Sequence, residues 1–168
     1  MEKNISNKLV KTAVIAAIYT VLTVMLAPIS YGIIQFRISE VMVLLAFFNP
    51  IYIGGLTLGC VIANIFGGNG PLDVIFGSLA TFLSVVAISL TSKYIKSTKL
   101  SIIIASLWPV IFNGLIIGWM LNKVSGMPFF VIMPQIALSE FIIVSVIGVP
   151  LALGLKKKYG SKLQLVKN

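Results

Sequence analysis

Histidine is absent from this sequence, cysteine occurs once, and acidic residues occur four times among 168 residues. The lack of histidine excludes His-ligated metal sites, Ser-His-Asp triads and histidine proton relays. Because Cys60 is the single cysteine, it forms no disulfide within the chain, and its expected role is that of a small buried side chain. Few catalytic arrangements remain, so we expect a protein that is not an enzyme and that binds no cofactor or metal.

Charged side chains are also scarce, at 10% of the residues, whereas hydrophobic residues make up 58% and the mean hydropathy is +1.07. A soluble domain of this size needs far more polar surface. About 20 apolar residues cross a bilayer as a helix, so the chain has room for roughly five or six crossings. The composition predicts an all-α integral membrane protein, a compact bundle of six transmembrane helices in a single domain, 1–168.

Proline residues indicate where the predicted helices end. Pro28 follows the first apolar run, and Asn49-Pro50 interrupts the second, because proline lacks an N–H group and disfavours a helical residue before it. Pro109 predicts a kink inside the fifth helix. The expected helices, with a basic tail over 156–168, are 11–27, 38–48, 52–66, 72–90, 101–121 and 134–155.

The 13 lysine and arginine residues give a net charge of +9, and most of them fall in three segments. These segments are the residues before the first helix, the connection 93–99 and the tail 156–168. Because basic residues concentrate in cytoplasmic loops, both termini and the connection 93–99 are expected to be cytoplasmic. This segregation indicates membrane topology and no nucleic-acid partner, and the tail is also suited to contact anionic membrane lipid.

Small residues recur at four-residue spacing on several predicted helices, a pattern that lets helix backbones approach closely in lipid. Ala13 and Ala17, near the cytoplasmic end of the first helix, serve either internal packing or the docking of another membrane subunit. The stripes that predict internal packing are Gly55, Gly59, Ala63 and Gly67 on the third helix and Gly114 and Gly118 on the fifth.

Polar residues gather at the helix ends that this topology places on the extracytoplasmic side. Three of them are carboxylates, although a charged side chain near the bilayer centre costs roughly 2.5–3.5 kcal/mol. Unpaired amides and carboxylates are costly to bury, so these side chains are expected to converge on each other or on a ligand. The candidates are Gln35, Arg37, Glu40, Asn64, Asn69, Asp73, Asn113, Trp119, Asn122, Gln135, Ser139 and Glu140.

Several candidates also have purely structural explanations. Asp73 is placed to offset the dipole at the start of its helix, and Arg37 precedes Glu40 by three residues, as in a pair on one helix face. Trp119 is suited either to anchor the membrane interface or to stack on a flat ligand at the mouth of a pocket. Glu140 lies nearly two turns into the last helix, beyond capping range, and is the strongest candidate for ligand binding.

The candidate set favours recognition of a small polar molecule over catalysis. Carboxylates and amides held together match a ligand such as a nucleobase, because a carboxylate accepts two neighbouring N–H groups of a guanine-like edge. The turn Gly67-Gly68-Asn69-Gly70 is not a nucleotide-binding P-loop, because no Gly-Lys-Ser/Thr follows it. Any energy for uphill transport is therefore expected to come from a partner.

Several runs in the sequence resemble the QueT family over nearly the whole chain. The resemblance implies a substrate-binding S component of an energy-coupling factor (ECF) transporter in the bacterial plasma membrane. It also implies a queuosine precursor as substrate, a 7-deazaguanine base such as preQ1, preQ0 or queuine, and partnership with a transmembrane coupling subunit and two cytoplasmic ATPases. The matching runs are Gln35-Phe36-Arg37-Ile38-Ser39-Glu40, Gly59-Cys60-Val61-Ile62-Ala63-Asn64, the segment 67–81 with Gly70-Pro71-Leu72-Asp73, Asn113-Gly114, and Gln135 with Ser139-Glu140.

A deazaguanine ligand also gives the leading hypothesis for the roles of individual residues. Glu140 is expected to bind the guanine-like edge, and Asp73 or Glu40 is expected near the 7-substituent of the base. Ala13 and Ala17 match the Ala-x-x-x-Ala motif with which S components dock onto the coupling subunit. The amides expected to assist Glu140 are Asn113, Asn64 or Gln135.

Three alternatives stay open at the level of the sequence. One is an S component for another vitamin or nucleobase, because substrates differ greatly on one scaffold. Another is a small intramembrane enzyme that uses paired carboxylates, against which stand the missing histidine and the lack of metal-ligand spacing. The third is a structural membrane subunit, which the cost of three outward carboxylates disfavours.

Overall fold

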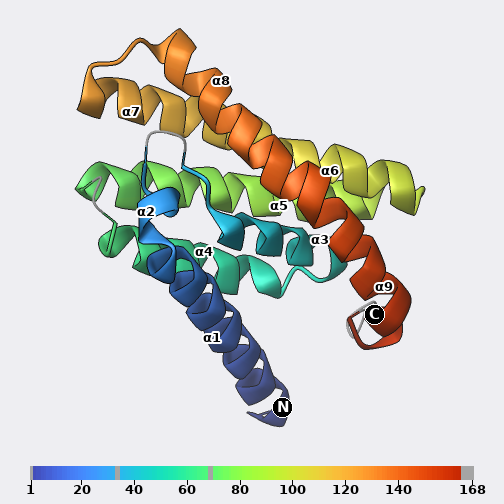
Figure 1. The fold of residues 1–168 in the computed structure, drawn as a ribbon. Coiled ribbons are helices and arrows are strands. Elements are labelled where there is room, and N and C mark those ends of the chain that lie inside the picture. Colours follow the sequence, from blue (N-terminus) through green and yellow to red (C-terminus); the bar gives the residue numbers. More distant parts are fainter. Residues whose placement is uncertain (1, 33–34, 68–69, 164–168) are drawn as a thin grey trace.

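The structure is a computed structural model that describes residues 2–32, 35–67 and 70–163. Every regular element within these ranges is helical, which agrees with the predicted all-α class (Figure 1). The predicted site residue Asn69 lies outside the described residues.

The first half of the chain contains one long helix and several shorter ones. Helix α1 begins well before the predicted start at residue 11 and ends at Met25, so Pro28 lies inside the next short helix. Proline suits the first turn of a helix, where the N–H groups have no partner within the helix. The elements are α1 (Glu2–Met25), α2 (Ala27–Ser30), the 3-10 helix η1 (Ile38–Leu44), α3 (Leu45–Phe48) and α4 (Tyr52–Ile65).

The second half consists of longer helical rods, each of which includes a π-helical stretch. Their ends extend beyond the predicted ranges, because the helices continue through basic and polar residues that the prediction had placed in loops. Pro109 lies within α6, which stays helical through it and continues into η3. The rods are η2 (Asp73–Gly77) with α5 (Ser78–Tyr94); α6 (Thr98–Phe112) with η3 (Asn113–Ile117) and α7 (Gly118–Ser125); and α8 (Phe129–Glu140) with η4 (Phe141–Gly148) and α9 (Val149–Leu163).

Four helical segments are long and apolar enough to cross a membrane, and two further apolar helices, Ile38–Phe48 and Tyr52–Ile65, are shorter. The described part of the chain therefore has the helices of a multi-pass membrane protein, whereas six crossings and cytoplasmic termini stay predictions. The long segments are Ser6–Met25, Asp73–Tyr94, Thr98–Ser125 and Phe129–Lys158.

The predicted glycine stripes pack helices against each other. A Cβ atom on Gly59 would lie 2.9 Å from the carbonyl oxygen of Ala16, and one on Gly55 would lie 2.8 Å from that of Thr12. Helix α4 thus meets the backbone of α1 directly, which only glycine permits at these positions. The role predicted for this stripe is confirmed, and Gly118 likewise approaches Met133 on α8, where a Cβ atom would lie 3.1 Å from its Cα atom.

The last rod closes the bundle over the earlier helices. In Figure 1 the rod formed by α8, η4 and α9 crosses α6 and the segment η1–α3, both of which contact η4. The buried face of this rod therefore contacts η1, the helix that carries Glu40. The contact is made through η4, and Glu140 is the residue directly before η4. This crossing brings the Glu140 side chain toward the polar residues of the first half of the chain.

Candidate functional site

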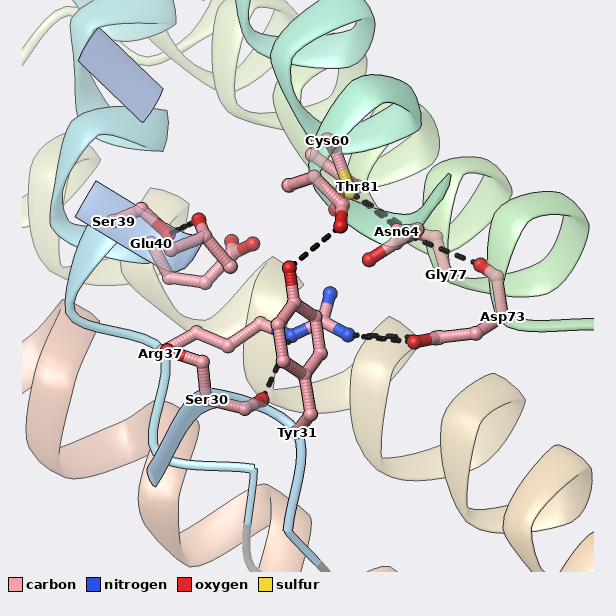
Figure 2. Close-up of polar contacts among 12 residues, drawn as sticks. Ser30, Tyr31, Arg37, Ser39, Glu40, Cys60, Asn64, Asp73, Gly77 and Thr81 are labelled. Atoms are coloured by element: carbon pink, nitrogen blue, oxygen red, sulfur yellow. Dashed lines mark hydrogen bonds and ion pairs between the residues drawn. The ribbon is translucent and has the colours of Figure 1, made fainter. Parts of the chain in front are cut away.

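The first component of the site is a buried ion pair. Arg37 Nη2 lies 3.1 Å from Asp73 Oδ2 and 3.4 Å from Oδ1, and Arg37 Nε donates to the carbonyl oxygen of Ser30 at 3.3 Å. Figure 2 shows Arg37 extended toward Asp73, which begins η2. The Arg37 and Asp73 side chains are 4% and 0% exposed. Such a pair is costly to break, because one charge would stay buried alone.

Arg37 does not form the predicted pair with Glu40. It is the residue before η1 and has extended backbone angles, φ −88° and ψ 97°, so it does not share a helical face with Glu40 three residues later. Burial by itself would lower the pKa of the Arg37 guanidinium, but the Asp73 carboxylate, together with Cys60, Tyr19 and Glu40, outweighs that effect and holds the pKa above its ordinary value. Arg37 is therefore a fixed positive charge in the site.

Tyr31 covers the guanidinium group of Arg37. Its ring centroid lies 5.5 Å from Arg37 Cζ, and its hydroxyl donates to the carbonyl oxygen of Ala63 at 2.6 Å. Partial burial raises the pKa of the Tyr31 phenol, so it stays a neutral donor. The close fit depends on Gly67, where a Cβ atom would lie 2.8 Å from Tyr31 Cε1. Tyr31 thus braces α4 against the loop that carries Arg37.

Asn64 connects α4 to the ion pair. Its Nδ2 atom donates to the carbonyl oxygen of Asp73 at 3.0 Å and contacts Cys60 Sγ at 3.4 Å, whereas its Oδ1 atom is buried without a hydrogen-bond partner in the protein. Gly77 makes room for both side chains, since a Cβ atom there would lie 2.6 Å from Asn64 Nδ2 and 2.7 Å from Asp73 Oδ1. Cys60 is buried, as the sequence predicts.

Glu40 and Glu140 supply two more buried carboxylates. Glu40 is 1% exposed, and its Oε1 atom accepts a hydrogen bond from the Tyr19 hydroxyl. Glu140 is 3% exposed and lies at the junction of α8 and η4. The Oε2 atom of each has no hydrogen-bond partner in the protein. Both carboxylates therefore have an oxygen available to a ligand.

Two buried amides also have groups without a protein partner. Asn113, the first residue of η3, is 5% exposed, and its Nδ2 atom has no partner. Gln35 is 3% exposed, its Nε2 atom has no partner, and its φ of 47° lies in the left-handed region, which is uncommon for residues other than glycine. Strained residues often occur in ligand sites.

The site atoms that lack protein partners include acceptors and donors. A buried polar group left without a hydrogen bond costs about 1–3 kcal/mol, and native proteins contain few of them. Eight such groups occur among the described residues, five of them on residues selected from the sequence, and these five are candidates for contact with a polar ligand. The atoms are the acceptors Glu40 Oε2, Asn64 Oδ1 and Glu140 Oε2 and the donors Gln35 Nε2 and Asn113 Nδ2.

The π-helical stretches coincide with this site. Asp73 and Asn113 are the first residues of η2 and η3, and Glu140 directly precedes η4. π-helical turns are rare and occur frequently at functional sites, because they change the direction of the side chains around them. The three rods of the second half thus depart from α-helical geometry where they carry candidate site residues.

Trp119 and Gln135 have different surroundings from the residues above. Trp119 is 46% exposed, packs edge-to-face against Phe76 with ring centroids 5.1 Å apart, and lines an apolar pocket of about 450 Å³. Gln135 is half-buried and lines another pocket, of about 260 Å³, together with Phe36 and Ser139. Their predicted role in substrate binding stays a prediction.

Tyr19 is the residue that sequence analysis missed. It is fully buried on α1 and donates to Glu40, and four residues further on, Thr23 bonds to Ser39 at 2.6 Å. The available signal was a tyrosine and a threonine at helical spacing in an otherwise aliphatic segment.

Ala13 and Ala17, by contrast, are exposed on the outer face of α1.

Residues 9–157 match the family described as QueT transporter. The chain belongs to the QueT transporter family. It is 44% identical over 85 residues to the queuosine precursor transporter QueT of Lactococcus lactis subsp. cremoris (strain MG1363). That match spans 49% of this chain and 50% of the relative, and no solved structure matches the chain.

Membership in the QueT family agrees with two expectations from the sequence. The family consists of transporters, which agrees with the prediction that the chain is not an enzyme. The four long apolar helices fit a multi-pass protein of the cell membrane. The unpartnered polar atoms therefore lie inside a member of a membrane transporter family, where a buried polar group is costly unless it serves packing or a ligand.

Proposed function

We propose that this QueT-family protein is the substrate-specificity subunit of an ECF-type importer and binds a queuosine precursor from the extracytoplasmic side for ATP-driven uptake. The observation that carries the proposal is the set of buried donors and acceptors without partners in the protein. A 7-deazaguanine base offers complementary groups: a carbonyl acceptor and neighbouring N–H donors on one edge. The name of the Lactococcus lactis relative supports the choice of substrate class.

Glu140 is the proposed partner of the guanine-like edge. Its Oε2 atom is buried and available, and a carboxylate can accept two neighbouring N–H groups in one bidentate contact. The donors Asn113 Nδ2 and Gln35 Nε2 are suited to the carbonyl oxygen of the base, and Asn64 Oδ1 to a further N–H group. The proposed ligand would thus satisfy the groups that the protein leaves unpaired.

The charges favour a precursor that carries an amine. Arg37 and Asp73 neutralise each other, whereas Glu40 and Glu140 have no cationic partner among the described hydrogen bonds and ion pairs. A protonated aminomethyl group near Glu40 would stabilise the charged form of that carboxyl group, which a nitrile cannot do. We therefore propose 7-aminomethyl-7-deazaguanine as the preferred precursor over the 7-cyano compound.

The proposed energy source lies in partner subunits. The sequence has no P-loop, and the exposed face of α1 carries Ala13 and Ala17 between apolar side chains, including Val10, Val14 and Val21. A face of small and apolar residues lets another membrane helix approach closely. We propose that the transmembrane coupling subunit docks there and transmits the work of two cytoplasmic ATPases.

Calorimetric titration of the purified chain with 7-aminomethyl-7-deazaguanine tests the role of Glu140. Glu140→Gln is expected to weaken binding about 10-fold to 100-fold, because a charge-assisted hydrogen bond contributes roughly 1.5–3 kcal/mol. Glu2→Gln makes the same chemical change near the N-terminus and is expected to bind like the unmodified chain. Equal affinity of all three proteins would refute the role of Glu140.

A further inference from the structure

A basic pocket lies at the end of the bundle where α3 and α5 finish and α6 begins. Its volume is about 260 Å³, and it includes aromatic and hydroxyl side chains besides three lysines. Lys93, in the last turn of α5, and Lys96, in the following connection, are neighbours in the sequence, whereas Lys156 comes from α9. The fold therefore brings a lysine of the last helix to the basic connection between α5 and α6.

The lysine charges in this pocket are not neutralised by its other walls. None of the described residues that line it is acidic. Lys156 is half-buried, and its Nζ atom donates to Thr98 Oγ1 at 2.9 Å, so its ammonium group is held at the pocket by a neutral partner. Lys93 Nζ lies 5.7 Å from the ring centroid of Tyr94. Three lysines that line one pocket give it a positive potential, which favours an anion there.

The start of α6 adds to the positive potential. Thr98 is the first residue of this helix, and the preceding Ser97 makes no side-chain cap hydrogen bond. The first turn of a helix carries unpaired N–H groups and a partial positive charge, which favour an anion such as phosphate. This contribution reinforces the three lysines.

Two aromatic side chains distinguish the pocket from a site for a free anion. Phe47 and Phe48 line it, and their rings pack edge-to-face with centroids 5.6 Å apart. The pocket also lies at the ends of two apolar spans, since one finishes at Tyr94 and the next begins at Thr98. Its position and lining thus suit a molecule with an anionic head and an apolar body at the membrane boundary.

We propose that this pocket binds the phosphate headgroup of an anionic phospholipid. The three lysines and the start of α6 would contact the phosphate, and the glycerol backbone and first acyl carbons would lie against Phe47 and Phe48. The proposal is independent of the substrate, because the pocket residues differ from those of the polar site. A bound lipid would fix α3, α5, α6 and α9 to each other at this end of the bundle.

Native mass spectrometry of the purified full chain with added phosphatidylglycerol tests this site. The triple variant Lys93→Gln, Lys96→Gln, Lys156→Gln is expected to lose at least about tenfold in affinity for one tightly bound lipid. A matched triple variant, Lys11→Gln, Lys99→Gln, Lys157→Gln, removes the same charge at exposed positions outside the pocket and is expected to bind as the unmodified chain does. Replacement of the three pocket lysines by arginine is expected to preserve binding.

Additional measurements distinguish a phospholipid from other possible occupants of the basic pocket. Phosphatidylcholine is expected to bind at least about tenfold more weakly than phosphatidylglycerol, and inorganic phosphate is expected to compete only weakly. An equal loss of lipid affinity in both triple glutamine variants, or no loss in either variant, would overturn the proposal. Full displacement of the lipid by equimolar inorganic phosphate would identify a free-anion site instead. Loss of assembly with another membrane subunit, with unchanged lipid binding, would identify a protein contact and would also overturn it.

Discussion

Among the buried acids, Glu40 and Glu140 differ from Asp73 in their hydrogen-bond and ion-pair partners. Asp73 is matched by Arg37 through two contacts, whereas Glu40 and Glu140 each leave one buried oxygen without a protein donor. The first arrangement is that of a structural pair, and the second is that of a group prepared for a ligand. We therefore propose that Arg37 and Asp73 position the loop before η1 against η2, and their predicted role in substrate binding stays a prediction.

The ion pair can be tested by a double-mutant cycle. Arg37→Met is expected to lower the free energy of unfolding by about 3–5 kcal/mol, because Asp73 would stay buried without its cation. Adding Asp73→Asn is expected to recover part of that loss, since the remaining buried charge is removed. Denaturation in mixed detergent micelles of the single and double variants measures the coupling. Strictly additive losses would show that the two side chains do not interact.

Sequence analysis identified most of the polar site residues but not their pairing. The cost of a carboxylate or amide in lipid was enough to select Glu40, Glu140, Asn64 and Asn113, which are all buried. The pairing of Arg37 with Glu40, which the sequence offered as one explanation, does not occur, because the extended backbone at Arg37 turns its side chain away from Glu40 and toward η2. Pairing across the fold depends on the approach of separate helices, which periodicity within one helix does not reveal.

Tyr19 escaped prediction for a related reason. A tyrosine in an apolar helix is most often part of the core, and Tyr19 is indeed fully buried. Its hydroxyl contacts a candidate site residue only because η1 brings Glu40 against α1. The hydrogen bond of Tyr19 therefore depends on Glu40, a residue that lies 21 positions later in the sequence.

At the scale of the elements, glycine spacing predicted the helix contacts well. Four-residue spacing of small residues on α4 marked the face that meets α1, and the contact is made by the glycines themselves. Helix ends were predicted less well, because basic residues such as Lys93 and Lys156 continue the helices beyond their apolar parts. The π-helical stretches at Asp73, Asn113 and Glu140 have no signature in hydrophobic periodicity.

The contact between α1 and α4 gives a prediction with a matched control on the same helix. Gly59→Ala is expected to destabilise the fold by about 1–3 kcal/mol, because its Cβ atom would lie 2.9 Å from the backbone of α1 and force the helices apart. Gly54→Ala is expected to be neutral or slightly stabilising, since its nearest neighbour would be 3.9 Å away. Thermal unfolding in detergent compares them, and equal midpoints would contradict the packing described here.

At the scale of the whole molecule, the two ends of the bundle differ in chemistry. Lysines gather where α5 ends and α6 begins, whereas the buried acids and amides lie around the starts of η2 and η3 and the end of α8. Composition and charge distribution predicted this separation, because membrane insertion sorts basic residues to one side. They could not place the helices relative to each other, which depends on long-range packing.

The proposed docking face on α1 also concerns the whole molecule. Ala13→Leu with Ala17→Leu is expected to prevent stable assembly with the coupling subunit, because two larger side chains would hold the partner helix away from α1. Base binding by the isolated chain is expected to be unchanged, since both positions face outward. Co-purification with the coupling subunit and calorimetry measure the two properties separately. Normal assembly of the double variant would show that docking uses another face.

The most direct test of the central claim is calorimetric titration of the folded, purified chain with 7-aminomethyl-7-deazaguanine, 7-cyano-7-deazaguanine and guanine. The buried unpartnered atoms and the unmatched carboxylates predict that the aminomethyl compound binds most tightly and guanine at least about tenfold more weakly, a difference of about 1.4 kcal/mol. Equal binding of guanine, or tighter binding of the cyano compound, would contradict the assignment of the two carboxylates. No binding of any base by folded protein would contradict the proposed substrate class.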